Sequence, residues 1–154
     1  MTERIAVLGA GQMGNGIAHV FAQAGFDVSM IDVSKTALAK GRETIAKNLD
    51  RQIKKGAIEQ IAKDAILGRI TDHDSLDAVN DASLVIEAVT ENRELKAKIF
   101  ADLDAKAPVG AILATNTSSI SITEIAGRTT RPELVIGMHF MNPVPVMQLV
   151  EVIR

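Results

Sequence analysis

The sequence predicts an α/β fold in which a doubly wound, mostly parallel sheet carries helices on both faces. Short runs that are apolar throughout recur along the chain, as expected of strands buried on both faces. Longer segments with helical periodicity separate these runs, and this alternation is typical of strand–helix–strand units. The length of 154 residues fits one domain, which we expect to span residues 1–154.

The same patterns place the individual elements. The expected strands are 5–8, 28–31, 70–71, 84–86, 111–114, 134–136 and 149–153. The expected helices are 14–24, 34–55, 57–67 and 91–105, with a short helix after Ser121. Ser34 is the expected N-cap of the long helix, and Ser121 with Glu124 forms a predicted capping box. Gly25 and Gly56 are expected to end the helices that precede them.

Composition excludes several classes of protein. The net charge of −2 gives no basic field for nucleic acid or an anionic membrane surface. The absence of cysteine excludes disulfides, thiol catalysis and cysteine metal sites, and no motif indicates zinc, iron or magnesium. The N-terminal apolar run is too short for a signal peptide, and no run approaches the roughly 18 apolar residues of a membrane helix. We therefore expect a cytoplasmic protein without metal.

A glycine-rich segment lies between the first expected strand and the first expected helix. A bare GxGxxG pattern is weak, but a strand before it and a helix after it are typical of a dinucleotide site. The first glycine allows a tight turn, the second lets a pyrophosphate approach the backbone, and the third permits close packing of helix and strand. The free N–H groups of the helix start, with about half a positive charge, then favour the phosphates. The residues of this segment are Gly9, Ala10, Gly11, Gln12, Met13 and Gly14.

Asp32 follows the second expected strand, at the position where such folds carry an acidic residue. Its carboxylate is expected to accept hydrogen bonds from the hydroxyls of the adenosine ribose and to repel a 2′-phosphate. NAD is therefore favoured over NADP as cofactor, although Lys35 nearby weakens that preference slightly. Together with the glycine turn, Asp32 predicts a Rossmann-type fold.

His139 is the candidate catalytic base. Oxidation of an alcohol by hydride transfer needs a group that takes the hydroxyl proton, and the pKa of histidine suits this role. Glu151, on the last expected strand, could contact the other ring nitrogen and stabilise the imidazolium. Spacing alone leaves open the alternative of a structural histidine and an unrelated surface glutamate.

Two further polar segments follow expected strands. Residues 116–119, with the sequence Asn-Thr-Ser-Ser, could form a site or an ordinary loop leading into the next helix cap. Residues 87–96 contain Glu91 and Lys96, and could form a site or a charged first turn of a helix.

Taken together, the motifs resemble those of the L-3-hydroxyacyl-CoA dehydrogenase family, especially its monofunctional members. The matching runs are GAGQMGNGIA, VIEAVTEN, NTSS and HFMNPVPVMQLVEVI, in the order and spacing of the family. They extend over residues 5–153 and so cover nearly the whole chain. The resemblance implies the NAD-dependent oxidation of (S)-3-hydroxyacyl-CoA, with 3-hydroxybutyryl-CoA as the expected substrate, in fatty acid or butanoate metabolism.

The resemblance also implies roles for single residues. His139 matches the family's base, Glu151 its carboxylate partner, and Ser118 the serine that hydrogen-bonds the substrate's 3-oxygen beside the nicotinamide. The positions that contact the nicotinamide half of NAD match Glu91, Lys96, Asn142 and Ser118. The family's coenzyme A contacts are a serine and a lysine, which match Asn48 and Lys55; the asparagine departs from the family's pattern and puts the first contact in doubt.

The family carries a second, all-helical domain that provides dimerisation, another wall of the cleft and a catalytic asparagine. This domain is not in the sequence, so we expect the isolated chain to bind NAD(H) with little turnover and its parent protein to be a homodimer. One alternative is an NAD(H)-binding module without catalysis. Another is a β-hydroxyacid dehydrogenase related to 6-phosphogluconate dehydrogenase, which shares the glycine-rich start but lacks the HFxNPV turn.

Overall fold

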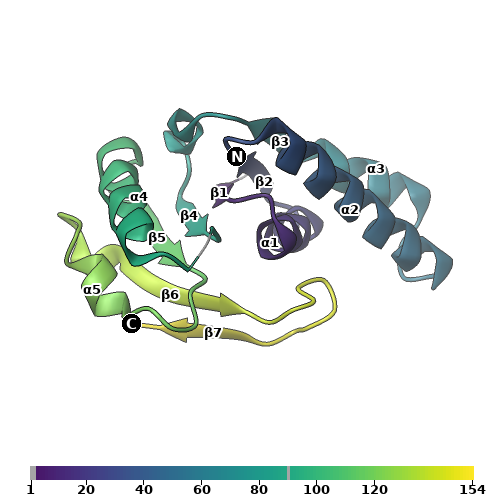
Figure 1. The fold of residues 1–154 in the computed structure, drawn as a ribbon. Coiled ribbons are helices and arrows are strands. Elements are labelled where there is room, and N and C mark those ends of the chain that lie inside the picture. Colours follow the sequence, from purple (N-terminus) through teal and green to yellow (C-terminus); the bar gives the residue numbers. More distant parts are fainter. Residues whose placement is uncertain (1–2, 90) are drawn as a thin grey trace.

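A seven-stranded sheet in the order β3-β2-β1-β4-β5-β6-β7 organises the computed structural model, which describes residues 3–89 and 91–154 (Figure 1). Strands β1 to β6 are mutually parallel, and β7 is antiparallel to β6. The strands are β1 Arg4–Leu8, β2 Asp27–Ile31, β3 Ile70–His73, β4 Leu84–Glu87, β5 Ile112–Thr115, β6 Val135–Phe140 and β7 Val150–Ile153. The helices are α1 Gln12–Gln23, α2 Lys35–Lys54, α3 Gln60–Gly68, α4 Arg93–Lys106 and α5 Ile122–Ala126, with 3-10 turns at Leu76–Val79 and Pro132–Leu134. The predicted α/β class with a mostly parallel sheet is confirmed.

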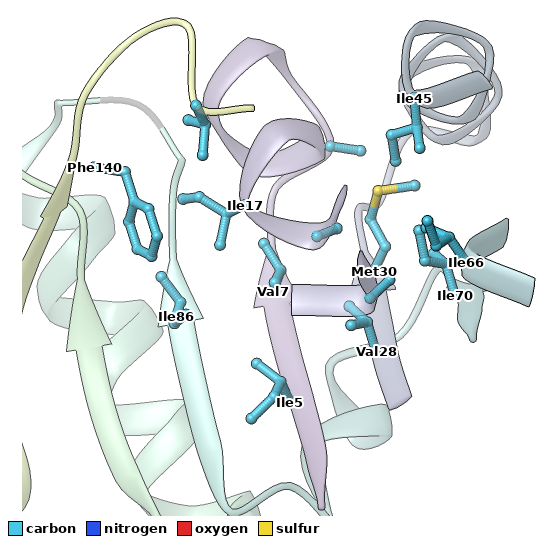
Figure 2. Packing of buried hydrophobic residues seen from close by; sticks show 14 of the residues in the cluster. Ile5, Val7, Ile17, Val28, Met30, Ile45, Ile66, Ile70, Ile86 and Phe140 are labelled. Atoms are coloured by element: carbon cyan, nitrogen blue, oxygen red, sulfur yellow. The ribbon is translucent and has the colours of Figure 1, made fainter. Parts of the chain in front are cut away.

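Both faces of the sheet are covered because alternate residues of its central strand point to opposite sides. Ile5 and Val7 of β1 belong to a core cluster that includes residues of α1, α2 and α3, part of which Figure 2 shows. Ala6 and Leu8 belong to a second cluster, which includes Phe100 of α4 and residues of α5. This two-sided burial explains why the strands read as continuous apolar runs.

The expected helix boundary signals are present in the structure. Ser34 Oγ accepts a hydrogen bond from the N–H of Ala37 at 3.1 Å, and Ser121 Oγ accepts one from the N–H of Glu124 at 3.3 Å. The second half of the predicted capping box differs, because the Glu124 carboxylate lies 3.5 Å from the Arg93 guanidinium. Beyond α1 and α2, Gly25 and Gly56 have φ values of +102° and +75°, a region that favours glycine.

Strand β6 continues to Phe140, whereas the sequence predicts a strand that ends at residue 136. Its added residues pair with β7, from Gly137 opposite Ile153 to Phe140 opposite Val150. This pairing joins segments separated by a turn and leaves no local signal in the chain. Strand β6 therefore places His139 inside the ladder rather than beyond the end of the strand.

The carboxyl ends of the six parallel strands lie at one edge of the sheet, which we call the carboxyl edge. Strand order reverses between β1 and β4, since β2 follows β1 on one side and β4 lies on the other. Ligands of open α/β sheets bind in the crevice at such a reversal. Because β7 runs antiparallel, it begins at this same edge. Within the described ranges, every helix is too short or too polar to cross a membrane.

Gly14 permits the close approach of α1 to the end of β1. A Cβ atom built at Gly14 would lie 1.9 Å from the carbonyl oxygen of Gly9, whereas one at Gly11 would have no neighbour within 4 Å. We therefore predict that Gly14→Ala lowers the free energy of unfolding by about 3 kcal/mol or more, as severe overpacking does.

Gly11→Ala is the matched control in the same loop and should cost less than about 1 kcal/mol, the scale of a poorer N-cap. Urea unfolding of both variants measures the difference. Equal stability of the two variants would contradict this account of the loop.

His19 is fully buried between α1 and α2. Its Nε2 atom lies 3.0 Å from Gln23 Oε1 and 3.3 Å from Gln52 Nε2, while its Nδ1 atom has no partner among the described residues. Burial lowers the pKa of His19 below its ordinary value of 6.5, and the hydrogen bond with Gln23 opposes this only in part. The folded state therefore favours the neutral form of the His19 imidazole.

Since the unfolded chain binds the proton more readily, the stabilising effect of neutral His19 is complete above pH 6.5 and is lost as the pH falls below that value. We predict that His19→Gln makes the free energy of unfolding less dependent on pH between 7 and about 5. Urea titrations at several pH values test this, with His73→Gln as control. An unchanged slope in His19→Gln would show that His19 does not govern this dependence.

Candidate active site at the carboxyl edge

The residues predicted to form the site lie in or next to six strands but gather at the carboxyl edge. The glycine loop follows β1, Asp32 follows β2, Glu91 follows β4, and the 116–119 loop follows β5. His139 lies near the end of β6 and Glu151 near the start of β7. The predicted coenzyme A residues Asn48 and Lys55 lie apart from these, at the C-terminal part of α2.

The glycine loop is shaped for an extended ligand. Gly9 has a φ of +106°, and a Cβ atom there would lie 2.7 Å from the carbonyl oxygen of Ala88. Gly11 is the N-cap of α1 and is open to solvent, so the first-turn N–H groups of α1 have a clear approach. Ala10 is buried, Gln12 is exposed and Met13 packs against the core cluster. This open, positively polarised helix start fits a pyrophosphate.

Asp32 is attached to the glycine loop. Its Oδ2 atom accepts a hydrogen bond from the N–H of Ala10 at 3.0 Å, and Oδ1 accepts one from the N–H of Ser34 at 2.9 Å. Each carboxylate oxygen keeps a lone pair for a further donor, such as a ribose hydroxyl. The Lys35 ammonium lies 3.8 Å from Asp74, on the side of β3. The geometry therefore fits a dinucleotide whose ribose lies over the end of β2.

His139 and Glu151 are directly opposite each other in the antiparallel β6–β7 ladder. The Nδ1 atom of His139 lies 3.8 Å from Oε1 of Glu151, which is ion-pair range but longer than a hydrogen bond. Both side chains retain access to solvent, with 27% of the His139 side chain and 54% of the Glu151 side chain exposed. A proton on Nδ1 of the imidazole would thus lie near a carboxylate, while part of the side chain stays open to solvent.

A buried ion pair lies behind this edge. The Lys96 side chain is 1% exposed and its Nζ atom is 2.7 Å from both carboxylate oxygens of Glu87, itself fully buried. Glu87 also accepts hydrogen bonds from Thr115 Oγ1 and the N–H of Val89, each at 2.7 Å. Sequence reasoning placed Glu87 in a candidate segment but gave it no role of its own, although a carboxylate that ends an apolar strand was a usable signal. The ammonium of Lys96 is therefore engaged inside the domain.

Glu91 connects this ion pair to the loop that carries Ser118. Its Oε1 atom lies 3.9 Å from Lys96 Nζ, and its Oε2 atom accepts hydrogen bonds from Thr117 Oγ1 at 2.6 Å and Ser119 Oγ at 2.8 Å. Partial burial raises the pKa of Glu91, but these hydrogen bonds and the charges of Lys96 and His139 outweigh it, so the pKa lies below its ordinary value. Ser118 itself is exposed.

Two asparagines join the loops around His139. Asn116 Oδ1 accepts a hydrogen bond from the N–H of Phe140 at 2.8 Å and so fixes the end of β6 against the loop after β5. Asn142 Oδ1 accepts one from Gln12 Nε2 at 3.3 Å, which links the turn after β6 to the glycine loop. Asn142 precedes a cis peptide bond to Pro143. Asn116 and Gln12 thus hold together segments that are distant in sequence.

A groove of about 740 Å³ lies beside this turn. Asn48, Arg51 and Lys55 line it from α2 and its C-terminal end, and Pro143 and Val146 line it from the turn after β6. Asn48 Oδ1 accepts a hydrogen bond from Arg51 Nη1 at 3.0 Å. The structure therefore brings both predicted coenzyme A residues to one groove and adds a second cation, Arg51, that sequence reasoning did not select.

Comparison with known proteins identifies the family of the chain. The sequence model of the family described as "3-hydroxyacyl-CoA dehydrogenase, NAD binding domain" matches residues 4–154. The chain is 53% identical over 152 residues to the 3-hydroxybutyryl-CoA dehydrogenase of Bradyrhizobium diazoefficiens, covering 99% of this chain and 52% of the relative. It is 49% identical to a probable 3-hydroxybutyryl-CoA dehydrogenase of Bacillus subtilis, covering 99% and 53%.

A crystal structure of (S)-3-hydroxybutyryl-CoA dehydrogenase from Ralstonia eutropha superposes with a TM-score of 0.95 at 47% identity, covering 99% of this chain and 54% of that one. The chain thus spans about half the length of the curated relatives it matches. The Rossmann-type fold and the predicted family are confirmed. The chain belongs to the 3-hydroxyacyl-CoA dehydrogenase family, as its NAD-binding domain.

Proposed function

We propose that this chain is the NAD-binding half of an NAD-dependent dehydrogenase that oxidises (S)-3-hydroxyacyl-CoA, with 3-hydroxybutyryl-CoA as substrate. The observation that carries the proposal is the meeting of His139 and Glu151 at the same edge of the sheet as the glycine loop. The names of the curated relatives support the choice of substrate.

Residues from both sides of the strand-order reversal would hold the cofactor. The 9–14 loop would receive the pyrophosphate and Asp32 the adenosine ribose, which leaves the nicotinamide half over the ends of β4 to β6. Asn142 is available there for direct contact, and Glu91 lies at the same edge with one carboxylate oxygen bonded to Thr117 and Ser119. Lys96, whose ammonium is bonded to Glu87, would act there mainly through its charge.

His139 would serve as the general base. An Nδ1–H directed at Glu151 leaves Nε2 as the free acceptor, which takes the hydroxyl proton of the substrate. When bound, NAD⁺ supplies the acceptor for the hydride from C3, and the products are 3-oxoacyl-CoA and NADH. The negative charges of Glu151 and Glu91 stabilise the resulting imidazolium. General acid–base help of this kind contributes about 10²–10⁴-fold to the rate.

Ser118 would hold the 3-oxygen of the substrate. Its hydroxyl is exposed on the loop after β5, the strand next to the one that carries His139. A hydroxyl donor fixes the oxygen whose proton leaves, and in the reverse direction it polarises the ketone before His139 protonates it.

The groove beside the turn after β6 would accept the coenzyme A moiety. Lys55 and Arg51 offer positive charge to its phosphates, while Pro143 and Val146 offer apolar surface to its pantetheine arm. Asn48 is bonded to Arg51, so its contribution would be to orient that guanidinium.

Several finer features belong to the same proposal. A helical second domain would complete the cleft and provide dimerisation, and the isolated chain would therefore bind NAD(H) with little turnover. Exposed apolar residues in and just before β7, including Val146, Leu149 and Val152, would suit contact with such a domain. We also propose a cytoplasmic location, and neither nucleic acid nor membrane as a partner.

His139→Gln tests the central role. In a chimera of this chain with the second half of the Bradyrhizobium diazoefficiens relative, we predict that this variant lowers kcat for acetoacetyl-CoA reduction by at least about 10²-fold. The NADH Kd should change by less than about twofold, because the imidazole acts on the substrate proton.

Stopped-flow turnover and NADH fluorescence titration provide the two measurements. His73→Gln, at the far side of the sheet, is the control and should retain full turnover. Undiminished kcat in His139→Gln would show that another group is the base.

A further inference from the structure

The loop that carries Ser118 depends on a single carboxylate oxygen. Oε2 of Glu91 accepts hydrogen bonds from the hydroxyl immediately before Ser118 in the chain and from the one immediately after it. The donors are Thr117 Oγ1 at 2.6 Å and Ser119 Oγ at 2.8 Å. Ser118 itself has no such contact within the described part of the chain and stays exposed between them. Both neighbours of Ser118 are thus bonded to the same oxygen of Glu91, while the Ser118 hydroxyl is left for a ligand.

The same contacts organise the backbone of the loop. Thr117 is only 2% exposed, and its Oγ1 atom also accepts from the N–H of Ser119 at 3.3 Å and of Ile120 at 3.1 Å. Because Thr117 Oγ1 uses its proton toward Glu91, both of its lone pairs are free for these two N–H groups. Loss of the carboxylate would let the Thr117 hydroxyl rotate and weaken the whole arrangement.

Glu91 is held in turn by a charge inside the domain. Lys96 Nζ lies 3.9 Å from Glu91 Oε1 and 2.7 Å from both oxygens of Glu87. The Glu87 carboxylate accepts hydrogen bonds from the N–H of Val89, just after β4, and from Thr115 Oγ1 of β5, so the ammonium has little freedom to move. The Thr117 and Ser119 hydrogen bonds and the charge of Lys96 together favour the ionised form of Glu91, and only this form is a pure acceptor for two donors.

We propose that Glu91 is a positioning residue for Ser118, and that Lys96 acts on the site through Glu91. Glu91 binds the hydroxyls of Thr117 and Ser119 and thereby sets the direction in which the Ser118 hydroxyl meets the 3-oxygen of the substrate. This role rests on the proposed dehydrogenase function for the identity of the ligand, but the ordering of the loop itself does not.

A direct contact of Glu91 with the cofactor would behave differently. Direct contact requires only the Glu91 carboxylate, so removal of the Ser119 hydroxyl would have no effect. Positioning requires the carboxylate and the hydroxyls together, so Glu91→Gln and Ser119→Ala should impair the same step. The effects of the two substitutions on kcat should therefore not be additive. The neighbouring exposed Glu94, in the first turn of α4, supplies the matched control Glu94→Gln.

Amide hydrogen exchange by NMR on this chain tests the loop without any need for turnover. We expect Glu91→Gln to speed exchange at Ser119 and Ile120 by about tenfold, the loss of roughly one charge-assisted hydrogen bond. Exchange in Glu94→Gln should match the wild type. Unchanged exchange in Glu91→Gln overturns the proposal, whatever the activity.

Kinetics of the chimera test the consequence for Ser118. We expect kcat to fall about tenfold in Glu91→Gln and in Ser119→Ala, with no further fall in the double variant and little change in KM for NADH. A higher KM for NADH in Glu91→Gln with normal kcat in Ser119→Ala overturns the proposal in favour of direct cofactor contact. If exchange is faster in Glu91→Gln but the wild-type chimera shows no turnover, the proposed function is contradicted. The role of Glu91 in ordering the loop then stays supported.

Discussion

Parallel pairing of six strands is the constraint on which the site depends. It places every strand's carboxyl end at one edge, so residues separated by more than a hundred positions in sequence become neighbours in space. The antiparallel β7 then brings Glu151 back to that edge and sets it opposite His139. A shift of one residue in the β6–β7 register would turn one of these side chains to the other face of the sheet and separate them.

The buried Glu87–Lys96 pair shows how this edge is made rigid. Removal of two charges from water is costly, and a lone buried charge is worse, so loss of either partner typically costs about 3–5 kcal/mol. The pair is compensated by three further contacts at 2.7 Å or 3.9 Å, from Val89, Thr115 and Glu91. The ion pair is linked through Glu91 to the Ser118 loop, so it can keep the charged groups of this edge in fixed positions while a ligand binds.

Much of the fold could be predicted because its signals are local. Apolar runs marked the strands, and Ser34 and Gly56 marked the ends of α2. The glycine loop and Asp32 form a pattern within one strand–helix–strand unit, so their joint position could be predicted as well. The extension of β6 and its register with β7 could not, because they depend on pairing across a turn.

The residues of the candidate site likewise divide into those with a local sequence signal and those that depend on long-range contacts. Spacing left the His139–Glu151 pairing open, and only the resemblance and then the ladder gave the two residues a common place. The segments that contain Glu87, Thr117 and Ser119 were singled out, but these residues received no role of their own, because their importance lies in contacts between β4, β5 and the loops after them that no local pattern reveals. Arg51 was missed because a charged residue on a helix surface is common, and only the groove distinguishes it.

Histidine NMR signals offer the most direct test of how the edge works. The chain contains only three histidines, His19, His73 and His139, so their ring signals can be followed separately during titration with NADH. If the nicotinamide half lies over the ends of β4 to β6, the ring signals of His139 will shift at saturating NADH while those of the buried His19 will not. Binding of NADH that leaves the His139 signals unmoved would contradict the account.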